Sequence, residues 1–272
     1  MPAMAALLFL FFIPMYYTIK LSFFSFSGEY IGLDAYTTAF SDPMIMDSLK
    51  FSLYLAAAST LLAAFFAVLI SMALRKTFIG KKIAVFMYQL NIPIPYIAFA
   101  LMMLLLLFNT GYMSRIFFEL GLTSSPLDFP AIMFSKAGLG IIITYTLKFI
   151  PFIGMSVLAI LQTSVPEYEE QAATLGAGRI RTFIHVTLPM ILPAVASTTI
   201  ITFAFAFGTY EIPYLLGSPS PLAMPVLAYN SFISYDMSLK PVSYAIANLM
   251  TIVIVAITFV YAYFASKRAV KR

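Results

Sequence analysis

The sequence predicts an all-α integral membrane protein with six transmembrane helices. Of its 272 residues, 62% are hydrophobic and only 10% are charged, whereas a soluble domain carries about 25% charged residues. The apolar residues also form long continuous runs without the alternation of a membrane β-barrel. We therefore expect one transmembrane domain over residues 1–272, whose outer wall faces lipid.

Six runs approach or exceed the roughly 20 apolar residues that cross the hydrocarbon core of a bilayer. They cover residues 3–24, 51–74, 83–108, 137–161, 190–216 and 242–264. The first run has no basic segment before it and no clear cleavage site, which favours a retained helix over a signal peptide. Prolines interrupt several runs, at Pro14, Pro93, Pro95 and Pro151.

The basic residues predict the orientation of these spans. Ten of the sixteen fall on one side, namely Arg75, Lys76, Lys81, Lys82, Arg179, Arg181, Lys267, Arg268, Lys271 and Arg272. An excess of Lys and Arg marks the cytoplasmic side of a membrane protein. The sequence thus predicts that both termini are cytoplasmic, and it explains the net charge of +5 by sidedness rather than by nucleic-acid binding.

The composition excludes several kinds of chemistry. The chain has no Cys and a single His, His185, so it offers no thiolate or multi-His metal site. It also lacks the G-x-x-x-x-G-K-[ST] pattern of a nucleotide-binding P-loop. We expect a chain that is not an enzyme, has no catalytic residue and no metal site, and draws its energy from a partner.

The connection between the fourth and fifth runs, residues 164–189, is patterned as two short helices. Ser164 and Glu167 have capping-box spacing, with Pro166 between them in the first turn. Glycines at 176 and 178 can end this helix and turn the chain. A second helix then begins near residue 179, with Ile180, Phe183 and Ile184 in one apolar stripe, and Pro189 and Pro193 are expected to close it.

The residues of this hairpin favour a protein partner over the membrane surface. Interfacial helices carry a face rich in Lys and Arg, whereas the first helix here carries Glu167, Glu169 and Glu170. Small side chains at Ala172 and Ala173 lie beside these acids. Such a shape predicts a knob that enters a groove on another protein.

The hairpin resembles the EAA loop of permease subunits of type I ABC importers, which are binding-protein-dependent systems. The pattern is Glu-x-Ala-x-x-x-Gly-Ala followed by Leu-Pro, and the matching residues are Glu170, Ala172, Gly176, Ala177, Phe183, Leu188, Pro189 and Pro193. Gln171 and Thr174 depart from the residues that the family often has there. The resemblance implies that Glu170 faces a basic residue of the ATPase subunit and that Gly176 allows the turn.

The same resemblance implies the partners and the location. We expect two ABC ATPase subunits, which bind ATP and Mg, a second and different permease subunit, and an extracytoplasmic substrate-binding protein. No cofactor is expected in this chain. The protein is expected in the inner or plasma membrane of a prokaryotic cell, where it couples ATP hydrolysis elsewhere to transport.

Five residues are candidates for the substrate pathway. Lys148 and Glu211 are ionisable within the predicted spans, where a charge costs a few kcal/mol and calls for a reason. Substrate contact is one reason, and a structural pairing of Lys148 or Glu211 is the other. Asn91, Tyr145 and Tyr210 are weaker candidates, because such residues are more often packed polar side chains than ligands.

The segment around Tyr210, Glu211 and Pro213 resembles permeases of the spermidine/putrescine subgroup. The resemblance implies a polyamine cargo, with opines, phosphonates, iron or sugars as alternatives within the same role. From a different class, an ion-coupled secondary transporter stays open, although few intramembrane acids are available for its relay. A membrane-embedded enzyme would lack an obvious acid–base group.

Overall fold

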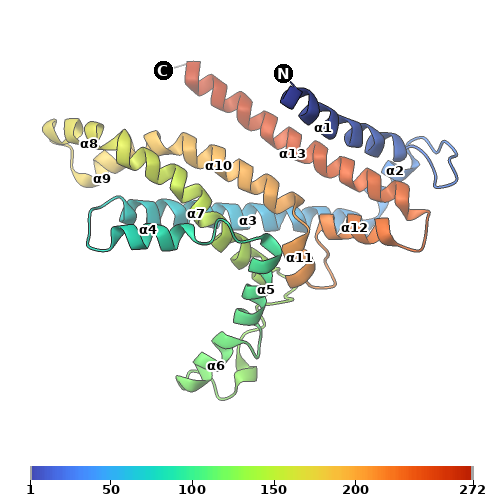
Figure 1. The fold of residues 1–272 in the computed structure, drawn as a ribbon, viewed down its shortest axis with the longest axis horizontal. Helices are drawn as coiled ribbons and strands as arrows, with labels where there is room; N and C mark the ends of the chain where they lie inside the picture. Colours follow the sequence, from blue (N-terminus) through green and yellow to red (C-terminus); the bar gives the residue numbers. More distant parts are fainter. Residues whose placement is uncertain (1, 271–272) are drawn as a thin grey trace. The chain divides into compact units, whose positions relative to one another are not determined.

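The computed structural model describes residues 2–270, which are helical with short connections (Figure 1). Lys271 and Arg272 of the predicted basic tail lie outside the described residues. The first half contains α1 Pro2–Leu21, α2 Asp34–Ser41, α3 Pro43–Leu74, α4 Lys81–Gln89, α5 Tyr96–Leu107, α6 Tyr112–Glu119 and the short η1 Pro126–Asp128. The second half contains α7 Leu139–Thr163, α8 Val165–Thr174, α9 Arg179–Thr182, η2 Phe183–Thr187, α10 Leu188–Gly208, α11 Glu211–Leu216, α12 Met224–Ile233 and α13 Leu239–Val270.

Five helical stretches of the described chain are long and apolar enough to cross a membrane. They are Pro43–Leu74, Tyr96–Glu119, Leu139–Thr163, Arg179–Gly208 and Leu239–Tyr263. The first predicted span is present as α1, but its apolar part, Ala6–Leu21, is shorter. The all-α membrane fold is confirmed, whereas the count of six spans and their orientation stay predictions.

Two predicted spans are interrupted in the structure. The run 83–108 divides into α4 and α5, because Pro93 and Pro95 lie in the break and have no N–H to donate to a helix. The run 190–216 divides into α10 and α11, with Thr209 and Tyr210 between them. The break in the run 83–108 lies where the prolines of the sequence interrupt it, whereas the break at Thr209 and Tyr210 was not expected. Each break leaves backbone groups that need other partners.

The described chain divides into two compact units. The first contains residues 1–54, 207–214 and 218–272, in which α13 packs against α1, α2 and α12. Asn248 of α13 is buried in this unit and donates from Nδ2 to Tyr36 Oη at 3.0 Å. Ser22 Oγ lies 2.8 Å from the same Tyr36 hydroxyl, so a polar cluster joins α13 to the segments at both ends of the α1–α2 connection.

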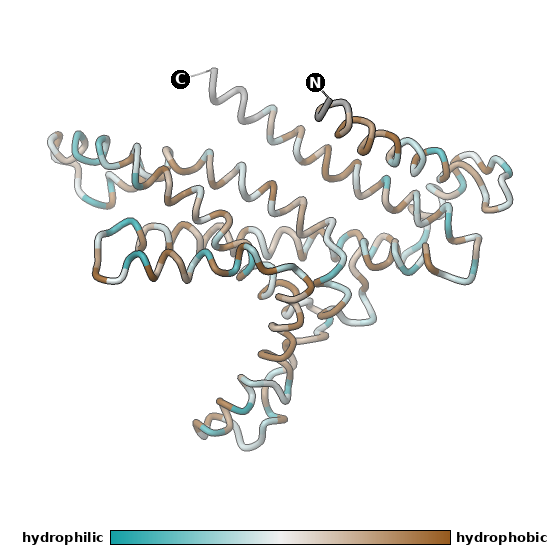
Figure 2. The backbone as a smooth tube through the Cα atoms, in the orientation of Figure 1, coloured by the Kyte–Doolittle hydropathy of each residue, from teal (hydrophilic) through white to brown (hydrophobic). Residues whose placement is uncertain are grey.

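The second unit contains residues 55–206 and 215–217, and α7 is its core. In the most apolar window of α7, 72% of the residues are buried, against 22–33% in the other four candidate spans. The less buried helices keep large apolar faces for lipid or for another subunit. Figure 2 shows that hydrophilic residues gather at the α8–α9 hairpin and at the α3–α4 turn of this unit.

Candidate functional site

The predicted hairpin is present as α8, a four-residue turn, and α9 with η2. Pro166 lies in the first turn of α8 as predicted, but the Ser164 side chain makes no capping hydrogen bond. Ser164 itself has helical backbone angles, because α8 follows α7 with only this residue between them. The predicted capping box was therefore wrong, since an N-cap residue needs a non-helical backbone to aim its side chain at the free N–H groups.

Gly176 ends α8 in a Schellman motif. Its φ of +80° is left-handed, the Gly176 N–H donates to Ala173 O at 3.0 Å, and the Ala177 N–H donates to Ala172 O at 3.0 Å. These two bonds satisfy carbonyls that the helix end would leave free. Gly178 has an ordinary extended backbone, so only one of the two glycines is required by its backbone angles.

The second helix of the hairpin does not close at the prolines. Instead α9 passes into the π-helical turn η2, and this continues into α10, with Pro189 and Pro193 inside the helical run. The Leu188 N–H donates to Phe183 O, five residues back. Pro189 lies at the start of α10, directly after this wider turn, where a missing N–H is tolerated. The second helix of the hairpin and the fifth predicted span thus form one continuous helical run, and the expected helix end at these prolines was wrong.

The outer surface of the hairpin is exposed. Glu170 and Ala173 face away from the described chain, and Ala172, Ala177 and Phe183 are half-buried. Of the predicted apolar stripe, Ile180 is 77% exposed and Ile184 is 50% exposed. These two isoleucines line a shallow open surface together with Gly178, Arg179, Arg181 and His185. Ile180 and Ile184 are thus largely exposed, whereas Phe183 of the same stripe packs partly against the described chain.

Glu169, the neighbour of Glu170, points the opposite way. Arg75 Nη1 donates to Glu169 Oε1 at 2.9 Å, and the buried Thr187 hydroxyl donates to the same oxygen. Partial burial by itself would raise the pKa of the Glu169 carboxyl, but these bonds and the Arg75 charge hold that pKa below its ordinary value. The carboxylate is therefore ionised at neutral pH and joins the α3–α4 turn to the hairpin.

The candidate site residues predicted from the sequence do not include Glu169, although its position in the predicted helix could have indicated it. It lies four residues after Val165, which is fully buried, so both share the inner face of α8. An acid on an inner face needs a partner. Nothing in the sequence identifies that partner as Arg75, which is 94 positions away.

Lys148 and Asn91 meet at the break between α4 and α5. The buried Lys148 ammonium donates to Asn91 O at 2.6 Å and to Ile94 O at 2.5 Å, and it lies 5.3 Å from the Tyr96 ring centroid. In return Asn91 Nδ2 donates to Leu147 O at 2.8 Å. Leu147 O is the carbonyl that lacks its helical donor because residue 151 is proline.

This arrangement bears on the question that the sequence left open for Lys148. Its ammonium donates to backbone carbonyls at the proline break, as the structural alternative requires, and a contact with substrate stays a prediction. Tyr145 is fully buried one turn earlier on α7, where its ring stacks on Phe149 with centroids 5.4 Å apart.

Tyr210 and Glu211 belong to the other compact unit. The Tyr210 ring lies 4.8 Å from both the Tyr214 and the Tyr229 ring centroids, in an aromatic cluster. Glu211 is half-buried in the first turn of α11 and forms no ion pair within the described residues. The pathway roles of these residues stay predictions.

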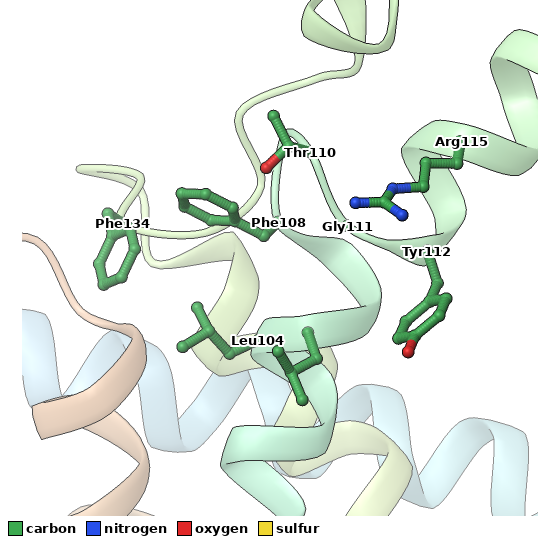
Figure 3. Close-up of a pocket in the computed structure, with 8 residues that line it drawn as sticks. Leu104, Phe108, Thr110, Gly111, Tyr112, Arg115 and Phe134 are labelled. Atoms are coloured by element: carbon green, nitrogen blue, oxygen red, sulfur yellow. The ribbon is translucent and has the colours of Figure 1, made fainter.

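A cavity of about 420 Å³ lies where α5 meets α6. Figure 3 shows Phe108 and Phe134 on one side of it, with Tyr112 and Arg115 on the other. Gly111 is needed at this joint, because an added Cβ would lie 2.5 Å from Leu105 O. The only charged side chain in the lining is Arg115. In the unit whose core is α7, Figure 1 places α6 at the end that lies far from the hairpin.

Comparison with known proteins identifies the family. Residues 63–271 match the family described as the binding-protein-dependent transport system inner membrane component. The match includes the whole hairpin and every helix from α4 onward. The chain belongs to this family of type I ABC importer permeases.

Individual relatives agree with the permease assignment. The inner membrane ABC transporter permease protein YdcU of Escherichia coli K12 is 30% identical over 189 residues, which cover 66% of this chain and 60% of YdcU. The sn-glycerol-3-phosphate transport system permease protein UgpA of Shigella flexneri is 26% identical over 254 residues, covering 88% of this chain and 82% of UgpA.

Solved structures show the same fold. A bacterial ABC transporter involved in the import of the acidic polysaccharide alginate matches with a TM-score of 0.81 at 19% identity, covering 98% of this chain and 93% of that one. A second structure, of a bacterial alginate ABC transporter in complex with alginate pentasaccharide-bound periplasmic protein, matches with a TM-score of 0.76. The permease is thus a multi-pass membrane protein, and the hairpin 164–189 carries its family motif.

Proposed function

We propose that this permease forms half of the translocation pathway of an ATP-driven importer and couples it to separate ATPase subunits. The observation that carries the proposal is the hairpin, whose outer face is exposed and whose inner face is bonded to its own chain through Glu169. A surface held rigidly yet left uncovered suits a protein partner. ATP and Mg then belong to the partner, because this sequence has no P-loop.

A charge reversal on the outer face tests this docking. In the Glu170→Lys variant the permease should lose copurification with the ATPase subunit, because a like charge replaces the attraction to a basic partner residue. Asp47→Lys is the matched control, since Asp47 is an exposed acid outside the hairpin. Undiminished copurification and transport in Glu170→Lys would contradict the docking surface.

The alternative of an ion-coupled secondary transporter has a separate test. Its relay would need ionisable groups within the membrane, and Lys148 is bonded to backbone carbonyls. We expect transport to stop when the ATPase subunits are omitted and to survive a proton ionophore while ATP is present. Transport that continues without any ATPase subunit and collapses with the ionophore would establish the alternative.

We infer that the cargo is an oxyanion or sugar-type solute. The relative UgpA is named for the transport of sn-glycerol 3-phosphate, a phosphate ester of a polyol, whereas neither YdcU nor UgpA is named for a polyamine. Calorimetry of the binding protein encoded beside this permease, titrated with phosphate esters, sugars and spermidine, checks the inference. Tight binding of spermidine alone would restore the polyamine assignment.

The assembly follows from the same proposal. We propose two ATPase subunits, a second and different permease subunit, and an external binding protein, in a prokaryotic inner membrane. The less buried candidate spans of this chain leave apolar faces for such a second subunit. Native mass spectrometry of the purified importer should show two permease masses, and a single permease mass in two copies would show a homodimer instead.

A further inference from the structure

One carboxylate oxygen joins three separate elements at the base of the hairpin. Glu169 of α8 accepts from Arg75, which directly follows α3, and from Thr187, in the last position of η2 before α10 begins. These segments are distant in sequence, since Arg75 and Glu169 are 94 positions apart. We call this set of three side chains the Glu169 clamp.

The Arg75 end of the clamp is fixed to a rigid frame. The Arg75 N–H continues the helical pattern of α3 by donating to Ser71 O at 2.9 Å, and Lys81 Nζ donates to Arg75 O at 3.2 Å. One turn earlier, Ser71 Oγ donates to Gly154 O at 2.9 Å, which ties α3 to the buried core helix α7. The backbone of Arg75, from which the guanidinium reaches the carboxylate, is therefore held in place.

The clamp differs in kind from the other ion pair of the described chain. The side chains of Arg75 and Glu169 are each 24% exposed, at 2.9 Å, while those of Lys50 and Asp47 are 75% and 67% exposed, at 3.4 Å. An exposed pair contributes little and is screened by salt. A half-buried, charge-assisted pair with a second hydrogen bond, here from Thr187, restrains geometry more strongly.

Apart from the clamp and its packing against α7 and η2, α8 joins the rest of the unit through two backbone connections. One is the single residue Ser164 between α7 and α8, and the other is the turn at 175–178 that leads to α9. Both could bend when a partner pushes on the outer face. The clamp bridges across them, and Glu169 is directly adjacent to the outward-facing Glu170.

We propose that Glu169 is a positioning residue for energy coupling, which makes α8, the end of α3 and the start of α10 move as one body. This inference rests on the proposed function. Displacement of the hairpin by an ATPase partner is delivered through the carboxylate to two membrane-spanning helices, instead of being absorbed by bending beside α8. Glu170 meets the partner, and Glu169 passes the movement on.

The first test measures transport and ATP hydrolysis together in the full importer, with its ATPase subunits and binding protein in proteoliposomes. Glu169→Gln and Thr187→Val should keep copurification with the ATPase but lower the substrate moved per ATP hydrolysed by about tenfold or more, the scale of a charged hydrogen bond. The swapped pair Arg75→Glu with Glu169→Arg should recover much of that ratio. Asp47→Asn, which breaks the exposed pair, is the control and should leave the ratio unchanged.

The second test measures the movement itself. Because the chain has no native Cys, a double variant with Leu69→Cys on α3 and Tyr168→Cys on α8 carries one spin label at each of these two positions. Both positions are exposed. Their separation should stay the same with and without a non-hydrolysable ATP analogue. In the Glu169→Gln background it should broaden or shift when the analogue binds.

The outcomes separate this inference from the proposed function. If the unmodified permease does not copurify with an ATPase subunit, the proposed function itself fails. If it copurifies but Glu169→Gln keeps the unmodified ratio of transport to hydrolysis, the clamp has no part in coupling. A nucleotide-dependent change in the Leu69–Tyr168 separation of the unmodified clamp would likewise overturn the inference, as would a swapped pair no better than the single variants.

Discussion

Gly176 and Gly178 illustrate how differently two glycines of one turn depend on being glycine. Gly176 has a φ of +80°, and nothing lies within 4 Å of an added Cβ at either residue. The demand at Gly176 is therefore purely one of backbone conformation. A left-handed backbone costs an ordinary residue roughly 1–2 kcal/mol.

We predict that Gly176→Ala loosens the turn, whereas Gly178→Ala does not. The expected cost is about 1 kcal/mol in local stability of the hairpin, because alanine must adopt a left-handed conformation at residue 176. Hydrogen exchange of the segment 165–182 measures this cost. Equal exchange rates in the two variants would show that the turn does not depend on the angle at Gly176.

A variant of Lys148 can test whether its role is structural or a contact with substrate. Its removal leaves the carbonyls of Asn91 and Ile94 without their donor, at about 1–3 kcal/mol for each unsatisfied buried group. We predict that Lys148→Met lowers thermal stability in detergent by several degrees, while Lys136→Met, at an exposed position, does not. A stable Lys148→Met permease that loses transport of one cargo only would favour a substrate contact instead.

At the scale of elements, α7 is held by polar contacts near its internal proline. Pro151 lies inside this helix, and the carbonyls beside it receive side-chain donors, with Tyr88 Oη donating to Ile150 O at 2.8 Å. Asn91 serves Leu147 O in the same way. The α4–α5 segment therefore packs on α7 through side-chain hydrogen bonds to backbone carbonyls next to Pro151, of which Leu147 O is left free by that proline.

Gly154 allows this close packing. An added Cβ there would lie 1.8 Å from Tyr88 Oη and 3.0 Å from Ser71 Oγ. We predict that Gly154→Ala displaces α4 and reduces the yield of folded permease, because Tyr88 must leave its site. Gly208→Ala is the matched control, since its nearest neighbour would be Ile254 Cδ1 at 3.9 Å.

Size-exclusion chromatography and thermal melting of both glycine variants check this prediction. Adding Tyr88→Phe to Gly154→Ala should recover part of the loss, because it removes the hydroxyl that lies nearest. An unaltered melting temperature in Gly154→Ala would mean that α4 can shift at no cost.

At the scale of the whole molecule, the open question is which segments lie on which side of the membrane. The chain has no Cys, so single cysteines can be labelled without background. Leu175 in the hairpin and Tyr235 in the α12–α13 connection are both highly exposed. An impermeant maleimide added to intact cells should label Tyr235→Cys and should not label Leu175→Cys.

Six spans also predict that a tag placed before residue 1 is cytoplasmic. Proteolysis of inside-out vesicles should remove such a tag, while intact spheroplasts should protect it. A tag exposed on the outside would show that α1 does not cross the membrane and that the described chain spans five times.

For the hairpin 164–189, some sequence-based predictions agree with the structure and others do not. Its two-helix form and the turn at Gly176 could be predicted, because capping glycines and helical spacing are local signals. The failed predictions were the capping box at Ser164 and the stop at Pro189. In both, the neighbouring helix continued into the segment and overrode the local preference.

By itself, the sequence determined the all-α membrane fold and the resemblance of the hairpin to the permease motif, since these depend on composition and on spacing along the chain. Only the tertiary structure decided that Glu169 is bonded inward while Glu170 is exposed, and that Lys148 donates to carbonyls at the proline break. Those roles depend on which distant backbone and side-chain groups meet. Arg75 reaches Glu169 only because the fold brings the C-terminal end of α3 close to α8, and no local pattern of the sequence specifies that contact.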